Sequence, residues 1–127
     1  MAETSTTVPI TAVTDGYFAM WSEPDPARRQ AIIAATWSED ATYVDPMFTA
    51  DGYPGLDALV RGVHERFPGH RFTLVGPVDT HHDRARWAWQ FGLDGAEPMA
   101  AGVDYAELAP DGRLRAVTGF FDRVASA

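Results

Sequence analysis

The sequence contains no cysteine among its 127 residues. Disulfides, thiolate metal sites and cysteine nucleophiles are therefore excluded for this chain. Long hydrophobic runs are also absent, and no stretch approaches the roughly 20 apolar residues that a helix needs to cross a bilayer. The opening string, MAETSTTVPITA, has neither a basic start nor an apolar core. We therefore expect no signal peptide, no membrane association and a cytoplasmic location.

Basic residues are scarce. Acidic side chains outnumber basic ones by 18 to 10, which gives a formal net charge of −8. No cluster of basic side chains is larger than a pair such as Arg28-Arg29. Binding to nucleic acid requires a basic face that neutralises phosphates. We therefore expect neither nucleic acid nor an anionic membrane surface as a partner.

Common signatures of cofactor binding and hydrolysis are missing as well. The chain has no Gly-rich phosphate loop and no G-x-S-x-G elbow. His81-His82-Asp83 lies at an expected hairpin turn, where neighbouring side chains point to opposite sides and no third metal ligand is evident. We therefore expect no metal site and no cofactor.

The length and apolar content that remain are those of one globular domain. Apolar residues make up 46% of the chain, which is enough for one hydrophobic core at this size. Residues 1–9 are largely polar, and we expect them to form a flexible tail. Residues 10–127 are predicted to form the single domain.

Three helices are predicted in the first half of the chain. Apolar residues recur at spacings of three and four over residues 10–22, which places them on one helical face. A second helix is expected over residues 26–37, because Asp25 can cap it and a proline suits its first position. The third covers about residues 56–67 and stops at a Pro-Gly pair.

The other segments have the patterns of β-strands. A short strand is expected before the third helix and four longer ones after it, over residues 41–45, 70–80, 84–93, 99–109 and 114–122. Helices that come first and antiparallel strands that follow are typical of the α+β class. The predicted architecture is a cone-shaped, curved antiparallel sheet with three helices packed on its concave face.

The strand over residues 99–109 is apolar on both faces. Ala100 and Gly102 share one face with Asp104, whereas Val103 and Tyr105 lie on the other. Such a strand is explained if one face meets the core and the other meets a second subunit. We therefore expect a homodimer that forms through the outer face of the sheet.

Several strings resemble the nuclear transport factor 2-like superfamily, which includes ketosteroid isomerases and SnoaL-like polyketide cyclases. They are WSEDATYVDP (37–46), PGLDALVRGVHERF (54–67), AAGVDYAEL (100–108) and PDGRLRAVTGFFD (110–122). The resemblance spans about residues 10–122 and implies a cystatin-like α+β barrel around one apolar pocket. Because the superfamily shares a fold and not a chemistry, function has to be argued from the pocket.

The polar residues are most similar to those of ketosteroid isomerase. The string DATYVDP puts Asp45 at the position of that enzyme's base, and Tyr17 and Asp104 stand where its oxyanion donors are. The resemblance implies a cofactor-free isomerase that abstracts a proton next to the carbonyl of an apolar substrate. The third helix departs from the pattern, because Val63-His64 occupies the stretch that in many isomerases carries a second tyrosine.

The chemistry of these three residues is compatible with proton abstraction. Asp45 ends a strand before a proline, at a rim where a pocket mouth would lie. A carboxyl among apolar neighbours, as expected for Asp104, tends to stay protonated and can donate to an oxyanion, which is the device of ketosteroid isomerase. Tyr17 supplies a second donor. Each also has a structural interpretation: a core tyrosine, a turn aspartate or a solvated strand carboxylate.

Aromatic and apolar side chains are expected to line the pocket. The predicted substrate-binding residues are Trp21, Trp37, Val63, His64, Trp87, Trp89 and Phe120. Such walls favour a small, flat, apolar carbonyl compound or metabolite. Three alternatives stay open: a SnoaL-like polyketide cyclase, a non-catalytic binding protein for a hydrophobic metabolite, and an interaction module. An epoxide hydrolase similar to the limonene enzyme is disfavoured, because Gly102 stands in the position of its strand arginine.

Overall fold

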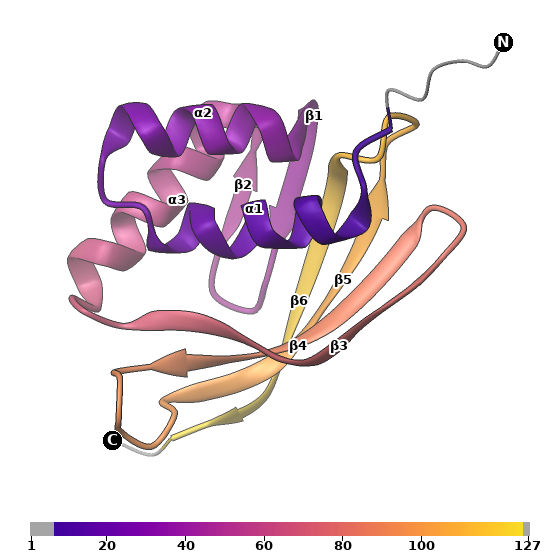
Figure 1. Cartoon of the computed structure of the whole chain (residues 1–127). Coiled ribbons are helices and arrows are strands. Elements are labelled where there is room, and N and C mark those ends of the chain that lie inside the picture. The colour runs from indigo at the N-terminus through magenta and orange to yellow at the C-terminus, as the bar shows by residue number, and fades with distance from the viewer. Residues whose placement is uncertain (1–6, 126–127) are drawn as a thin grey trace, which may run out of the picture.

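Three helices lie against one six-stranded sheet (Figure 1), in a computed structural model that describes residues 7–125. The helices are α1 (Ile10–Ser22), α2 (Pro26–Thr36) and α3 (Gly52–Arg66). The strands are β1 (Trp37–Val44), β2 (Thr49–Asp51), β3 (Arg71–His81), β4 (Arg84–Gly92), β5 (Ala100–Leu108) and β6 (Leu114–Val124). In the described part of the chain, no helix has the length and apolar character needed to span a bilayer.

The strands are ordered β2-β1-β6-β5-β4-β3 in a single curved sheet. Neighbouring strands are antiparallel except for β1 and β6, which run parallel. The sheet stays open, and the helices cover its concave side (Figure 1). The predicted α+β cone is confirmed, with one correction: the sheet is mixed and not entirely antiparallel.

Local signals start the second helix where the sequence predicts. The Asp25 carboxylate accepts a hydrogen bond from the Arg28 backbone N–H at 2.9 Å, and a proline occupies the first turn. Gly16 then allows α1 and α2 to approach closely, because a Cβ at this position would overlap the hydroxyl of Thr36. This close approach packs α1 against α2.

A buried ion pair joins the helices. The Nε of Arg29 lies 2.6 Å from Oδ1 of Asp57 on α3, and its Nη1 donates to the Glu23 carbonyl at 2.9 Å. Arg29 is only 2% exposed, so water does not screen this pair. The interaction fixes α3 against α2 and against the turn that follows α1.

Two segments differ from the expectation. Trp37, predicted as the end of the second helix, begins β1 and pairs with Leu114 of β6. Thr49–Asp51, predicted as loop, forms the short strand β2 beside β1. The start of β1 depends on a partner strand that is distant in sequence, and β2 is too short to leave a periodic pattern. In both places pairing between strands overrides the local signal. Of the predicted tail, residues 1–6 lie outside the described residues, and the Val8 N–H donates to the Asp111 carbonyl at 2.7 Å.

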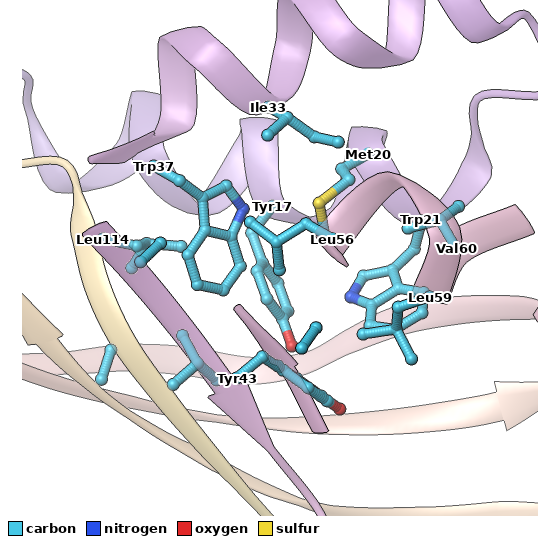
Figure 2. Close-up of a cluster of buried hydrophobic side chains, with 14 of the residues drawn as sticks. Tyr17, Met20, Trp21, Ile33, Trp37, Tyr43, Leu56, Leu59, Val60 and Leu114 are labelled. Atoms are coloured by element: carbon cyan, nitrogen blue, oxygen red, sulfur yellow. The ribbon is translucent and has the colours of Figure 1, made fainter. Parts of the chain in front are cut away.

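The core fills the space between the helices and the inner face of the sheet (Figure 2). Its buried members come from all three helices and from β1, β2, β4, β5 and β6. Those labelled in the figure are Tyr17, Met20, Trp21, Ile33, Trp37, Tyr43, Leu56, Leu59, Val60 and Leu114. The Tyr17 side chain passes through this cluster toward the sheet, which brings its hydroxyl to the inner face of β5.

Candidate functional site

Tyr17 and Asp104 meet in the interior of the protein. The Tyr17 hydroxyl donates to Oδ2 of Asp104 at 2.7 Å. Tyr17 lies on the buried face of α1, and Asp104 lies on the inner face of β5 opposite Trp87 and Gly119. The two residues are 2% and 3% exposed. Asp104 is therefore a buried carboxyl, and the interpretation of it as a solvated surface charge is wrong.

The side chains of Asp45 and Asp104 both lie against Gly119 of β6. A Cβ placed on Gly119 would be 2.8 Å from Oδ1 of Asp104 and 3.3 Å from Cβ of Asp45. Glycine leaves this space open, so both acidic side chains pack around the same point. The structure thus brings together the three residues that the sequence suggests for catalysis.

Three hydrogen bonds hold the Asp45 carboxylate. Its Oδ1 accepts from the backbone N–H groups of Met47 and Phe48 at 2.8 Å each, and its Oδ2 accepts from the Tyr43 hydroxyl at 2.6 Å. A carboxylate oxygen has two lone pairs, so Oδ2 keeps one for a substrate proton. Asp45 is half-buried and lines the cavity described below, which suits a base at the rim.

Tyr43 is a site residue that the sequence analysis missed. It lines the cavity, and its phenol connects the base to the interior of the site. Burial, followed by the negative charges of Asp104 and Asp45, raises the pKa of Tyr43 far above its ordinary value, so the phenol stays a neutral donor. Strand alternation could have found it, because residues two apart on a strand face the same side.

Burial sets the protonation of Asp104. It raises the pKa of this carboxyl to about 7, against the opposing effect of hydrogen bonds from Tyr17 and from the indole N–H of Trp87 at 3.2 Å. Burial also raises the pKa of Tyr17 well above its ordinary value, and the charge of Asp104 adds to this effect. Asp104 is therefore an acid that titrates near neutrality beside a phenol that does not.

The bond between Tyr17 and Asp104 limits what the pair can offer to a ligand. Tyr17 has one proton, and it is directed at Oδ2 of Asp104. A ligand oxygen receives a donor from the pair when Asp104 is protonated, because the acid then donates from Oδ1 or releases the Tyr17 proton for the ligand. Both groups act as one switchable donor, which refines the expectation of two independent donors.

These polar groups open on a narrow aromatic cavity of about 80 Å³. Among the described residues that line it, none is basic, and its aromatic walls include Trp21, Phe72, Trp89, Phe91 and Phe121. Pockets for drug-sized ligands usually measure roughly 300–1,000 Å³. The cavity therefore suits a small, flat molecule, and a steroid enters it only if the walls move apart.

The predicted substrate-binding residues divide into two groups. Trp21, Val63 and Trp89 line the cavity, whereas Trp37 and Trp87 lie outside its lining. Trp87 still acts on the site, because it donates to Asp104.

His64 and Phe120 do not reach the cavity. Nε2 of His64 lies 2.6 Å from the Trp21 carbonyl oxygen, so this side chain joins α3 to the end of α1 and does not line the cavity. Phe120 is 52% exposed on the outer face of β6, and its prediction as a pocket residue is wrong. Gly119 pairs with Asp104 and therefore faces the interior. Because successive side chains of a strand alternate between its faces, Phe120 points outward and Phe121 points inward.

Metal binding has no ligand cluster in this part of the protein. Among residues 7–125, no group of three or more His, Asp or Glu side chains could hold an ion. The polar groups that line the cavity are carboxyls, phenols and indole N–H groups, which suit an organic ligand with a polar oxygen.

Comparison with known proteins gives no match to any family profile and none to a curated protein. Solved structures do match. A candidate isomerase of the SnoaL-like family from Agrobacterium tumefaciens str. C58 is 33% identical, with a TM-score of 0.83. The alignment covers 89% of this chain and 97% of that one.

More distant structures share the fold. A protein with a ketosteroid isomerase-like fold from Catenulispora acidiphila DSM 44928, solved in complex with trimethylamine, is 14% identical at a TM-score of 0.68, over 84% of this chain and 82% of that one. A candidate polyketide cyclase from Sinorhizobium meliloti is also 14% identical, at 0.67 over 92% and 99%. The identity and coverage of the Agrobacterium structure establish more than a fold. The chain belongs to the SnoaL-like family of the nuclear transport factor 2-like superfamily.

Proposed function

We propose that the protein is a cofactor-free isomerase that moves a proton next to the carbonyl of a small apolar compound. The observation that carries the proposal is that two carboxyls in different environments, Asp45 and Asp104, lie next to each other at Gly119. Asp45 is hydrogen-bonded at the cavity rim, whereas Asp104 is buried and titrates near neutrality. Two carboxyls in contrasting environments can divide the roles of base and acid between them.

The reaction follows from the positions of the two acids. Oδ2 of Asp45 takes a proton from the carbon next to the substrate carbonyl, and the C–H electron pair forms a new C=C bond as the carbonyl π pair moves to oxygen. Protonated Asp104, acting with Tyr17, donates a hydrogen bond to that oxygen. The substrate already has a C=C bond between its β- and γ-carbons. Asp45 then returns the proton to the γ-carbon: the oxygen electron pair re-forms the carbonyl, the new C=C bond moves into the α,β position, and the electrons of the original C=C bond form the γ C–H bond, with no net oxidation.

The size of the cavity directs the assay toward one-ring substrates. We expect the wild type to convert 3-cyclohexen-1-one into its conjugated isomer more readily than a 5-ene-3-ketosteroid. Asp45→Asn and Asp104→Leu should each lower kcat by about 10²–10⁴-fold, the range typical for loss of an acid or base. Asp94→Asn, in an exposed turn, is the matched control. Absence of turnover of either compound by the wild type would overturn the proposal.

Cyclisation is the second candidate, because two structures that share the fold are candidate polyketide cyclases, one of them SnoaL-like. The same base and donors would form an enolate that attacks a second carbonyl of the substrate. The chain contains no lysine, so such an aldol step would proceed through the enolate and not through an imine. Formation of a ring from a diketone, with no turnover of the enone, would favour cyclisation. Tight binding with no turnover, unchanged by Asp45→Asn, would favour a binding protein.

A further inference from the structure

Three buried indole N–H groups have no hydrogen-bond partner among the described residues, and they belong to Trp21, Trp37 and Trp89. A buried donor without a partner loses its bonds to water and gains nothing in return. Such groups are uncommon in folded proteins, and each requires an explanation.

Two of the three donors lie at the cavity. Trp21 and Trp89 line it and are each 4% exposed, whereas Trp37 is fully buried outside the lining. Figure 2 shows the Trp21 indole nitrogen on the side of the ring that faces the Tyr17 hydroxyl. The unpaired N–H of Trp21 is therefore directed at the polar end of the cavity.

Electrostatics place the two donors near the reacting groups. Burial is the main cause of the raised pKa of Tyr17 and of Asp104. The Trp21 N–H acts to lower the pKa of Tyr17, and the Trp89 N–H acts to lower the pKa of Asp104. Neither indole forms a hydrogen bond of ordinary geometry with these groups. Both N–H groups thus lie near the reacting groups without a close partner there.

We propose that the indole N–H groups of Trp21 and Trp89 bind the oxygen of the ligand, so that the cavity selects small planar cyclic compounds with a carbonyl, enolate or phenolate oxygen. The proposal rests on the proposed function for the location of the site, but not on turnover. It adds two donors that do not themselves titrate.

The charges around the cavity support this class of ligand. Asp45 and Asp104 disfavour a carboxylate ligand, and none of the described residues in the lining supplies a positive charge to offset them. Neutral N–H donors are suited to an oxygen whose charge is shared with a conjugated ring. Carbonyl compounds that enolise and phenols both meet this requirement.

Packing holds the two indoles in place. The Phe72 ring lies between them, with centroid distances of 4.7 Å to Trp21 and 5.3 Å to Trp89. Trp89 also rests on Gly102, where a Cβ would come within 2.6 Å of the indole ring. Donors fixed in this way lose little conformational freedom when a ligand binds.

A matched pair of probes tests the proposal. 4-Nitrophenol and 4-nitrotoluene share ring and nitro group, so the ratio of their affinities reports on the phenol oxygen. We expect Trp21→Phe and Trp89→Phe each to lower this ratio at least about tenfold, the lower end of the effect of one hydrogen bond to a charged group. Trp37→Phe removes an equally unpaired N–H outside the cavity, and it should keep the wild-type ratio. The visible absorbance of bound 4-nitrophenol should also show more phenolate in the wild type than in the two cavity variants.

Indole NMR of the wild type gives the same answer without a substitution. The chain has 4 tryptophans, and 4-nitrophenol should shift the indole N–H signals of Trp21 and Trp89 downfield but leave that of Trp37 in place. Failure of the probe to bind, or equal ratios in all three variants, would overturn the inference. Enone turnover is measured separately, so an active enzyme with unchanged ratios contradicts the inference alone. Changed ratios in an inactive protein contradict only the isomerase proposal.

Discussion

At the scale of single residues, the behaviour of Asp104 with pH follows from its burial. Its pKa of about 7 in the folded protein exceeds the ordinary value of 3.8, so folding takes up a proton between these values. The stability that protonated Asp104 contributes is complete below the unfolded value and is lost as pH rises through about 7.

We therefore predict that the wild type loses stability relative to Asp104→Asn between about pH 4 and pH 8, by at most roughly 4 kcal/mol. Urea denaturation of both proteins across this range measures the difference. A difference that does not change with pH would show that Asp104 is ionised in the folded protein at all these values.

The space at Gly119 gives a second prediction at this scale. A Cβ there would press on Oδ1 of Asp104, so Gly119→Ala should displace the acid, lower isomerase activity at least tenfold and destabilise the fold by about 1–3 kcal/mol. Gly62→Ala is the control, because a Cβ at this position of α3 has no atom within 4 Å and should be neutral or stabilising. Thermal unfolding and enone turnover give both readouts. Equal behaviour of the two variants would contradict the crowding at Gly119.

At the scale of elements, the buried guanidinium of Arg29 predicts an asymmetry between two arginines that share one partner. Arg29→Met leaves Asp57 without its buried partner and should lower the free energy of unfolding by about 3–5 kcal/mol. Arg61→Met removes a 57% exposed arginine from the same carboxylate and should change it by less than about 1 kcal/mol. Chemical denaturation separates the two cases, and equal losses would contradict the assignment.

The elements also show how far sequence reasoning reaches. The start of α2 was predictable because its cap and its proline are adjacent residues. The start of β1 at Trp37 was not, because it depends on pairing with Leu114, which is far along the chain. The three candidate catalytic residues carry a family pattern, and the structure brings their side chains together, whereas their catalytic role stays a prediction. The inward turn of Phe121 in place of Phe120 depends on strand register, and the sequence permits either.

At the scale of the whole molecule, an apolar patch remains on the outer face of the sheet. Tyr105 of β5 and Phe120 of β6 are 45% and 52% exposed, and their rings pack edge to face at 5.7 Å. Exposed aromatic clusters on a sheet face favour association with another surface. We propose that this patch is the interface of a homodimer, as the two apolar faces of the strand suggest.

The corresponding prediction concerns oligomeric state. Tyr105→Asp and Phe120→Asp should each convert a dimer into a monomer, because they would bury a charge at the interface. Leu93→Asp, a change at a 49% exposed residue outside the patch, should leave the dimer intact. Light scattering coupled to size-exclusion chromatography measures the mass in solution, and a monomeric wild type would rule out the proposed dimer.

The position of β6 between β1 and β5 has a consequence for how the protein acquires its chemistry. β1, which precedes Asp45, and β5, which carries Asp104, are not paired with each other. Both pair with β6. Base and acid therefore become neighbours only when the last strand inserts. A chain that lacks β6 keeps both carboxyls in its sequence but has no strand to bring them together, so the reactive centre depends on a segment that carries neither of them.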